Sequence, residues 1–294
     1  NIYMAWADLP ASAGFSASIS GNIGKVKSRG IDGSIDINHF FNPDFWVSGR
    51  ANFTYAVNEY LKLSEPSYTD SYRSRIGHNI NQQWGYVAER LFVDEAEIAN
   101  SPQQGFGTYM PGDIKYKDIN NDGKIDAGDQ IPIGHPSVPE VQYGFGLSTG
   151  YKKIDLSFFF QGNARVSFFV NPTSIAPFQN RRNALQIVAD DYWTETNPNI
   201  HAFWPRLSTT PLENNVQTST WWLRDGKFLR LKTLEIGYNI LEINQIGLKG
   251  SRIYLSGENL FVISPFKLWD PEMGGNGLGY PINRRFNIGI QLSF

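Results

Sequence analysis

Apolar and polar residues alternate with a period of two along several stretches of this 294-residue chain. Successive side chains of a β-strand point to opposite faces, so this pattern is typical of strands with one apolar and one polar face. The clearest stretch is the last, where apolar residues occupy every second position from Phe286 to Phe294. The same pattern occurs at 45–58, 141–148 and 153–161. It predicts an all-β protein.

One further stretch, 228–240, alternates imperfectly because its apolar residues change face midway. Leu231 lies on one face of the expected strand, whereas Leu234 and Ile236 lie on the other. An extra residue in a strand, a β-bulge, moves all later side chains to the opposite face. We therefore predict a strand here with a bulge near Thr233.

The connections between these stretches fall into two classes of length. The short ones are Phe41–Asp44, Gly150–Lys153 and Leu241–Ser251, and the long ones are 59–140, 171–219 and 264–283. Counted back from the C-terminus, every short connection falls at one end of the strands and every long one at the other. A β-sandwich also has alternating strands but does not require this sorting. Short periplasmic turns opposite long extracellular loops are typical of outer-membrane barrels, so a transmembrane antiparallel β-barrel is predicted.

The number of strands bears on the size of that barrel. About eight strong strands are visible, with one or two weaker ones near the start, of which residues 14–21 (GFSASISG) are the best. Eight strands can close a small barrel. Loops this long on so small a barrel would be unusual, however, and the abrupt start (NIYMAWADLPASAG) favours a piece of a larger one. The polar residues expected to face its interior include Arg50, Asn52, Gln142 and Asp155.

Composition excludes several other classes of protein. The net charge is −2, without a basic run that could neutralise a phosphate backbone, so no nucleic-acid partner is expected. The sequence has no cysteine, which rules out disulfides and thiolate metal sites within it. No apolar run approaches the roughly 18 residues of a membrane-spanning helix. The chain starts without a recognisable signal peptide.

Several motifs resemble those of the SusC/RagA family of TonB-dependent outer-membrane transporters. They follow one another in the family's order: the run from WGYVAERLF through PGD and DINNDGKI to YGFG, then YWTETNPN, WPRL, WWLRDGKFLRLKTLEIGYNI, SGENLFVIS, DPE and the final strand ending in Phe294. The resemblance covers essentially the whole chain. It implies that residues 1–294 are the C-terminal portion of a barrel of about 22 strands. The family's plug domain and TonB box are not found in this sequence.

The resemblance also implies a function. The complete protein would be a non-enzymatic importer in the bacterial outer membrane, with its long loops extracellular. It would take up oligosaccharides or peptides together with a SusD-like surface lipoprotein. Energy would come from the TonB–ExbB–ExbD complex through the N-terminal part of the protein.

The segment YKDINNDGKIDAGDQ contains a pattern of oxygen-bearing residues typical of a calcium-binding loop. Asp118, Asn120, Asp122, Lys124 (through its carbonyl), Asp126 and Asp129 occupy the ligand positions, and Gly123 occupies the turn. The flanking residues do not predict helices, and prolines follow the loop closely. We therefore predict a lone structural Ca²⁺ site without an EF-hand helix pair. An acidic surface turn that binds no metal is the alternative.

Other candidate sites are weaker. Trp204, Trp221 and Trp222 lie in the long segments, where flat aromatic faces could contact a sugar, although packing within the loops explains them as well. The four histidines share no ligand spacing for zinc. Adjacent carboxylates such as Asp190 and Asp191 lack the context of a glycosidase cleft. No catalytic constellation can be assembled, so the protein is predicted not to be an enzyme.

Two alternatives to a transporter remain from the residues alone. One is a small autonomous outer-membrane barrel that acts as an adhesin or scaffold. The other, less favoured, is a calcium-stabilised extracellular β-rich enzyme.

Overall fold

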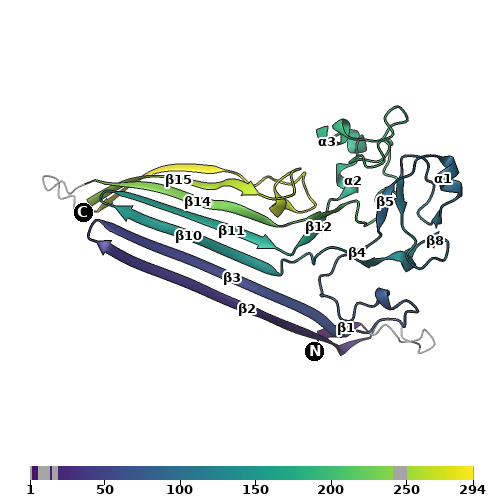
Figure 1. The fold of residues 1–294 in the computed structure, drawn as a ribbon, viewed down its shortest axis with the longest axis horizontal. Coiled ribbons are helices and arrows are strands. Elements are labelled where there is room, and N and C mark those ends of the chain that lie inside the picture. Colours follow the sequence, from purple (N-terminus) through teal and green to yellow (C-terminus); the bar gives the residue numbers. More distant parts are fainter. Residues whose placement is uncertain (1, 6–13, 15–18, 241–249, 294) are drawn as a thin grey trace.

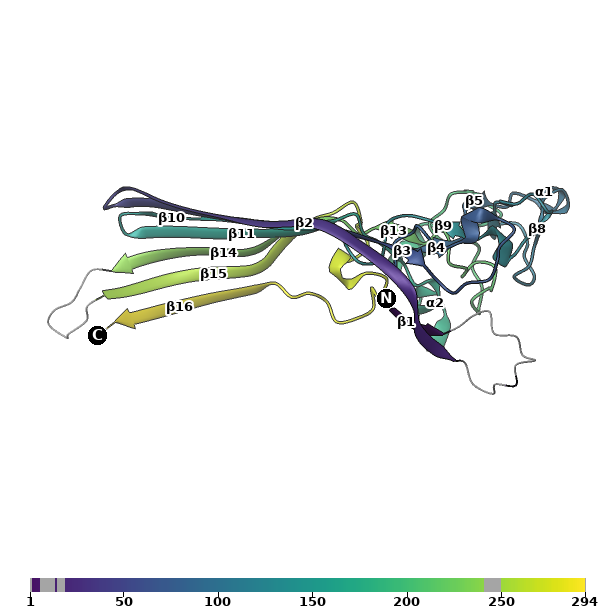
Figure 2. The ribbon, with the colours of Figure 1, turned by 90° about the horizontal axis from the view of Figure 1, so that it is seen from below.

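The computed structural model describes residues 2–5, 14, 19–240 and 250–293, and its main element is an eight-stranded antiparallel sheet (Figure 1). The strands of this sheet, in their spatial order, are β1 (Ile2–Ala5), β2 (Ser20–Asn42), β3 (Phe45–Lys62), β10 (Val141–Tyr151), β11 (Ile154–Ala164), β14 (Phe228–Ile240), β15 (Gly250–Ile263) and β16 (Arg285–Ser293). Each strand pairs with the next one along the chain that belongs to the sheet. The sheet is curved across its width from β2 to β16 (Figures 1 and 2). The predicted all-β antiparallel architecture is confirmed, and the described sheet is open, with β1 and β16 at its edges.

The register places nearly all large apolar side chains of the sheet on one face. Ile288 lies opposite Leu255, which in turn lies opposite Ile236, and the alternation continues across to β2. These side chains are exposed: Ile31, Ile35, Phe53, Phe145, Leu147, Ile154, Ile236, Tyr238, Ile253, Leu255, Phe286, Ile288, Ile290 and Leu292. A continuous apolar surface of this width is far larger than the scattered apolar residues of a soluble monomer.

The described short turns lie together at one end of the sheet, and the long connections lie at the other (Figure 1). The turn between β10 and β11 contains Lys152 in the left-handed backbone region (φ 53°). The backbone N–H of Lys152 donates to the carbonyl of Asp44, in the turn between β2 and β3, at 2.7 Å. The sorting predicted from sequence is thus confirmed for these two turns. The third short connection falls largely on residues 241–249, outside the described residues.

The predicted bulge in β14 is also confirmed. In the pairing with β11, Thr233 lies opposite Phe159 and Leu231 lies opposite Phe160, so Lys232 is the extra residue. In the pairing with β15 the register shifts at the same place, next to Asn259, whose φ is 53°. The weak strand predicted at 14–21 is described only in part, because residues 15–18 lie outside the described set, and its last residues begin β2.

The long connections fold together into what we call the loop layer, residues 63–140, 165–227 and 264–284. Its strands form four small pairs: β4 (Trp84–Gly85) with β9 (Ile131–Pro132), β5 (Ala88–Leu91) with β7 (Ile114–Tyr116), β6 (Gln103–Gln104) with β8 (Lys124–Ile125), and β12 (Ser167–Phe169) with β13 (Leu223–Asp225). Its helices are short: α1 (Glu95–Ala99), α2 (Pro172–Ile175), α3 (Gln186–Asp190), and the 3₁₀ turns η2 (Ser71–Arg73), η3 (Ala127–Asp129), η4 (Gln179–Arg181) and η6 (Pro271–Met273).

The loop layer has a hydrophobic core of its own. All three connections contribute to it, with Tyr86 from the first, Trp222 from the second and Phe266 from the third among its buried residues. The long connections are therefore folded, and they bury apolar side chains as a soluble domain does. No helix in the described part of the chain has the length and apolarity needed to cross a membrane.

Candidate functional site

The face of the sheet opposite the apolar one is polar, and several of its charged side chains form ion pairs. Arg50 Nε lies 2.5 Å from Asp36, across the β2–β3 pair. Arg252 donates to Asp155 and, at 2.7 Å, to Glu235, so it joins three strands. The register places the predicted interior residues Arg50, Asn52, Gln142 and Asp155 on this one face.

A buried arginine connects the sheet to the loop layer. Arg230 of β14 is only 2% exposed, and its Nη2 donates to both carboxylate oxygens of Asp270 at 2.5 and 2.7 Å. Its Nε lies 2.6 Å from Glu272, an ion-pair contact without the alignment of a hydrogen bond. Asp270 and Glu272 belong to the DPE motif, and Asp270 also caps η6 by accepting from the Glu272 N–H. The paired arginine fixes where the third connection leaves the sheet.

A second buried polar cluster joins two connections inside the loop layer. Asp113 is fully buried and accepts from Asn215 Nδ2 at 2.7 Å and from the Met110 N–H at 2.9 Å. The guanidinium of Arg206 lies 2.9 Å from the same carboxylate. Burial raises the pKa of Asp113 above its ordinary value, while Asn215 and Arg206 oppose that rise. The polar contacts hold residues about one hundred positions apart in sequence in one arrangement.

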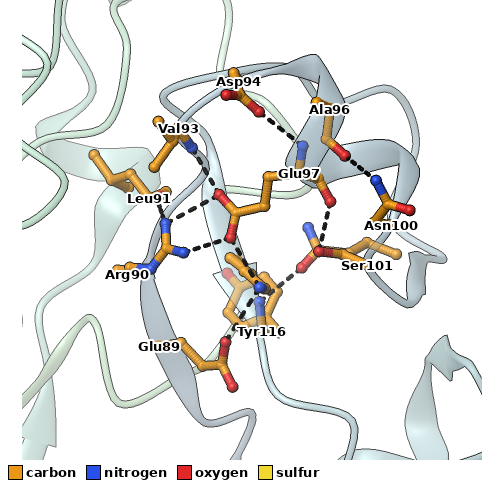
Figure 3. Close-up of polar contacts among 12 residues, drawn as sticks. Glu89, Arg90, Leu91, Val93, Asp94, Ala96, Glu97, Asn100, Ser101 and Tyr116 are labelled. Carbon is orange, nitrogen blue, oxygen red and sulfur yellow. Dashed lines mark hydrogen bonds and ion pairs between the residues drawn. The ribbon is translucent and has the colours of Figure 1, made fainter.

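Glu97 of α1 is the centre of a third polar cluster (Figure 3). Its carboxylate accepts from both Nη atoms of Arg90 at 3.0 and 2.6 Å, from Lys115 Nζ at 2.9 Å and from the Val93 N–H at 2.9 Å. Burial alone would raise the pKa of Glu97, but the Val93 N–H together with Lys115 and Arg90 brings that pKa below its ordinary value. The cluster ties α1 to β5 and β7.

The loop predicted to bind calcium is closed by its own hydrogen bonds. Asp118 accepts from the N–H groups of Asn121 and Gly123 at 2.6 and 2.8 Å, and Asp122 accepts from the Lys124 N–H at 2.9 Å. The other predicted ligands are engaged in the same way: Asn120 accepts from the Asp122 N–H, Asp126 from Gly128, and Asp129 from Ile119 and Asp126. Across the described residues, no three His, Cys, Asp or Glu side chains are grouped to hold a metal ion. These hydrogen bonds shape residues 118–129 as a turn, and the Ca²⁺ site remains a prediction.

The tryptophans predicted to contact sugar lie in the core of the loop layer. Trp222 is 1% exposed and donates its Nε1–H to the Asn215 carbonyl at 2.8 Å, and Trp204 packs beside it with ring centroids 5.2 Å apart. Trp221 is half-buried and donates to the Phe203 carbonyl. The rings of Trp204 and Trp222 are buried in this structure and pack within the loop layer.

Taken together, the observed features define a class of structure: a curved antiparallel sheet, apolar on one face and ion-paired on the other, with a folded loop layer at one end. Comparison with known proteins identifies relatives of this chain. The chain is 26% identical over 317 residues to TonB-dependent receptor P26 of Formosa agariphila, and 25% identical to TonB-dependent receptor SusC of Bacteroides thetaiotaomicron, with 97% of the chain covered in each case. No model of a known protein family matches it.

Solved structures lead to the same class. The RagAB peptide transporter matches 98% of the chain with a TM-score of 0.71 and 25% identity, and the RagAB peptide importer in its open-open state matches with a TM-score of 0.72 and 24% identity. The chain is therefore SusC/RagA-like, similar to the C-terminal portion of these proteins, as its motifs predicted. It spans 31% of the length of receptor P26 and 28% of the length of SusC. These relatives are TonB-dependent receptors and a peptide transporter.

Proposed function

We propose that this chain forms one arc of the wall of an outer-membrane TonB-dependent importer, with the loop layer at its extracellular mouth. The observation that carries the proposal is the separation of the two faces of the sheet. Apolar side chains across its full width suit contact with lipid, and a polar, ion-paired opposite face suits the interior of a barrel. The described long strands have nine or more residues, which is enough to cross a bilayer when tilted.

In this proposal the complete protein takes up oligosaccharides or peptides. It works with a SusD-like lipoprotein that docks on the loop layer, and the TonB–ExbB–ExbD complex supplies energy through the N-terminal part. The similarity to SusC and to the RagAB peptide importer supports this assignment. The packed core of the loop layer supports it too, because a preformed surface binds a partner at a lower cost in conformational entropy than a disordered one. We propose separately that residues 118–129 bind a structural Ca²⁺.

The test is a deletion of the gene in its own bacterium, complemented with the full-length wild-type protein. Cells without the protein are expected to lose uptake of a defined oligosaccharide or peptide mixture, with uptake measured by depletion of the mixture from the medium. A tagged full-length protein is expected to co-purify with a surface lipoprotein. Unchanged depletion of both mixtures would contradict the import function.

The intact mass of the product in purified outer membranes separates an importer from a small autonomous barrel. A mass several times the 33.2 kDa of this chain is expected for an importer with a plug domain. A product near 33.2 kDa would favour the adhesin or scaffold instead.

A further inference from the structure

Phe159 is an aromatic residue on the polar face of the sheet. Its neighbours on that face of β11 are Ser157 and Gln161, while Phe158 and Phe160 point to the apolar face. The ring of Phe159 lies over two glycines of β10. A Cβ added at Gly144 would lie 2.7 Å from its Cζ, and one added at Gly146 would lie 2.7 Å from its Cδ2. The ring therefore extends along β10, and the missing side chains of the glycines leave room for it.

Two hollows of the polar face meet at this ring. One, of about 430 Å³, is lined by residues that include Asn52, Gln142, Gln161 and Phe159. The other, of about 340 Å³, extends toward the turn end of the sheet and is lined by Arg50, Ser148 and again Phe159. Phe159 lies between the two hollows, so a ligand that fills both has to pass over its ring.

The hydrogen-bonding groups left over around the ring are neutral. In the described part of the chain, the exposed amides of Asn52, Gln142 and Gln161 form no side-chain hydrogen bond, and the shielded Oδ1 of Asn163 has no partner. Among the charges nearby, Arg50 is paired with Asp36, and Arg230 is shared by Asp270 and Glu272. The carboxylate of Asp32, next to the first hollow, accepts a hydrogen bond from the Thr54 hydroxyl. An amide both donates and accepts, which matches a hydroxyl group as a partner.

We propose that Phe159 and the surrounding amides form a contact site for a neutral oligosaccharide. This inference rests on the proposed import function and narrows its cargo. A sugar ring has an apolar face of C–H groups, which fits over an aromatic ring, and a rim of hydroxyls, which the amides can bind. A peptide carries charged termini and side chains. Its anionic groups find no unpaired cation among the residues that line the two hollows, and they lose hydration on entering.

The experiment uses the full-length protein purified from outer membranes in detergent. It is incubated with a mixture of neutral malto-, xylo- and laminari-oligosaccharides and, separately, with a tryptic digest of serum albumin. The ligand retained per folded molecule is measured by mass spectrometry. The wild type is expected to retain oligosaccharide in preference to peptide. Phe159→Leu and Gln161→Leu are each expected to reduce that retention about tenfold, the effect of losing one or two good contacts.

Asn287→Leu is the matched control, because Asn287 lies on the polar face of β16 and lines neither hollow. It is expected to retain oligosaccharide like the wild type. If all variants retain oligosaccharide equally, the result agrees with the import function but contradicts the proposed contact site at Phe159. Retention of peptide alone also overturns the site, and retention of neither mixture overturns both proposals. A lower yield of folded Phe159→Leu protein with unchanged retention per molecule would make Phe159 a packing contact with another part of the protein.

Discussion

The sheet and the loop layer use apolar residues in opposite ways. In the sheet the largest apolar side chains point outward, and Ile288 is 79% exposed. In the loop layer they point inward, and Trp222 is 1% exposed. The loop layer therefore gains its stability in water from burial, as a soluble domain does, whereas the apolar face of the sheet needs an apolar surrounding to cover it. One chain thus contains a loop layer that is suited to water and a sheet whose apolar face is suited to lipid.

The largest effect is expected from a cavity in the loop layer. Trp222→Ala removes a fully buried ring and should cost about 3–5 kcal/mol. Limited proteolysis should then cut residues 165–227 much faster, while the strands of the sheet remain protected. Tyr280→Ala is the control, because Tyr280 is 85% exposed and its loss should leave proteolysis unchanged. Simultaneous exposure of the sheet would show that the two regions are not separate.

A charge on the apolar face of the sheet should have a somewhat smaller effect. Ile288→Arg should cost about 2–4 kcal/mol if the side chain lies near the bilayer midplane. The measurement is folding of the full-length protein into lipid vesicles over a urea series. Asn287→Arg places the same charge one residue away on the polar face and should cost little. Equal costs at the two positions would contradict the assignment of faces.

The cluster around Glu97 gives the loop layer a pH dependence. Because the folded-state pKa of Glu97 lies below its ordinary value of 4.5, its contribution is fully present above that pH. The contribution is lost as the pH falls through the lower folded-state pKa. The thermal stability of Glu97→Gln should therefore fall short of the wild type at neutral pH and approach it in acid.

The matched control for this prediction is Glu89→Gln. Glu89 contacts the same Lys115 at 3.6 Å but is more exposed, so a smaller difference from the wild type is expected. A constant difference between Glu97→Gln and the wild type at all pH values would argue against the ionised cluster.

The smallest effect concerns the predicted calcium site. Ca²⁺ is expected to raise the thermal stability of the loop layer slightly, because a ligand that binds only the folded state stabilises it by mass action. Asp122→Ala should remove that rise. Identical melting with and without Ca²⁺ would leave residues 118–129 as the hydrogen-bonded turn described here.

The sheet was more predictable from sequence than the loop layer, for a physical reason. Strand alternation is local, so it revealed the faces, the sorting of the connections and the bulge at Lys232. The residues that form the core of the loop layer show no such periodicity in the sequence. Asp113 and Arg206 meet only through the tertiary fold, which also buries Trp204 and Trp222, two of the three tryptophans that suggested a ligand surface.

Phe159 shows the same limit within the sheet. Its position in β11 predicts the polar face, where strand alternation leads one to expect a polar residue and not an aromatic one. Only the register brings it over Gly144 and Gly146 of the neighbouring strand. Glycines at alternate positions of one strand, next to an unexpected aromatic residue in the next strand, are the signal that could have revealed it.

The most direct test of the claim that one face of the sheet lies against lipid is a cysteine scan of β16, since residues 1–294 contain no cysteine of their own. Single cysteines at Phe286 to Leu292 would be labelled in the full-length protein in vesicles, and quenching from the lipid phase would be measured. The account predicts strong quenching at Phe286, Ile288, Ile290 and Leu292 and weak quenching at the positions between them. Uniform quenching, or none, would contradict the claim that one face of the sheet lies against lipid.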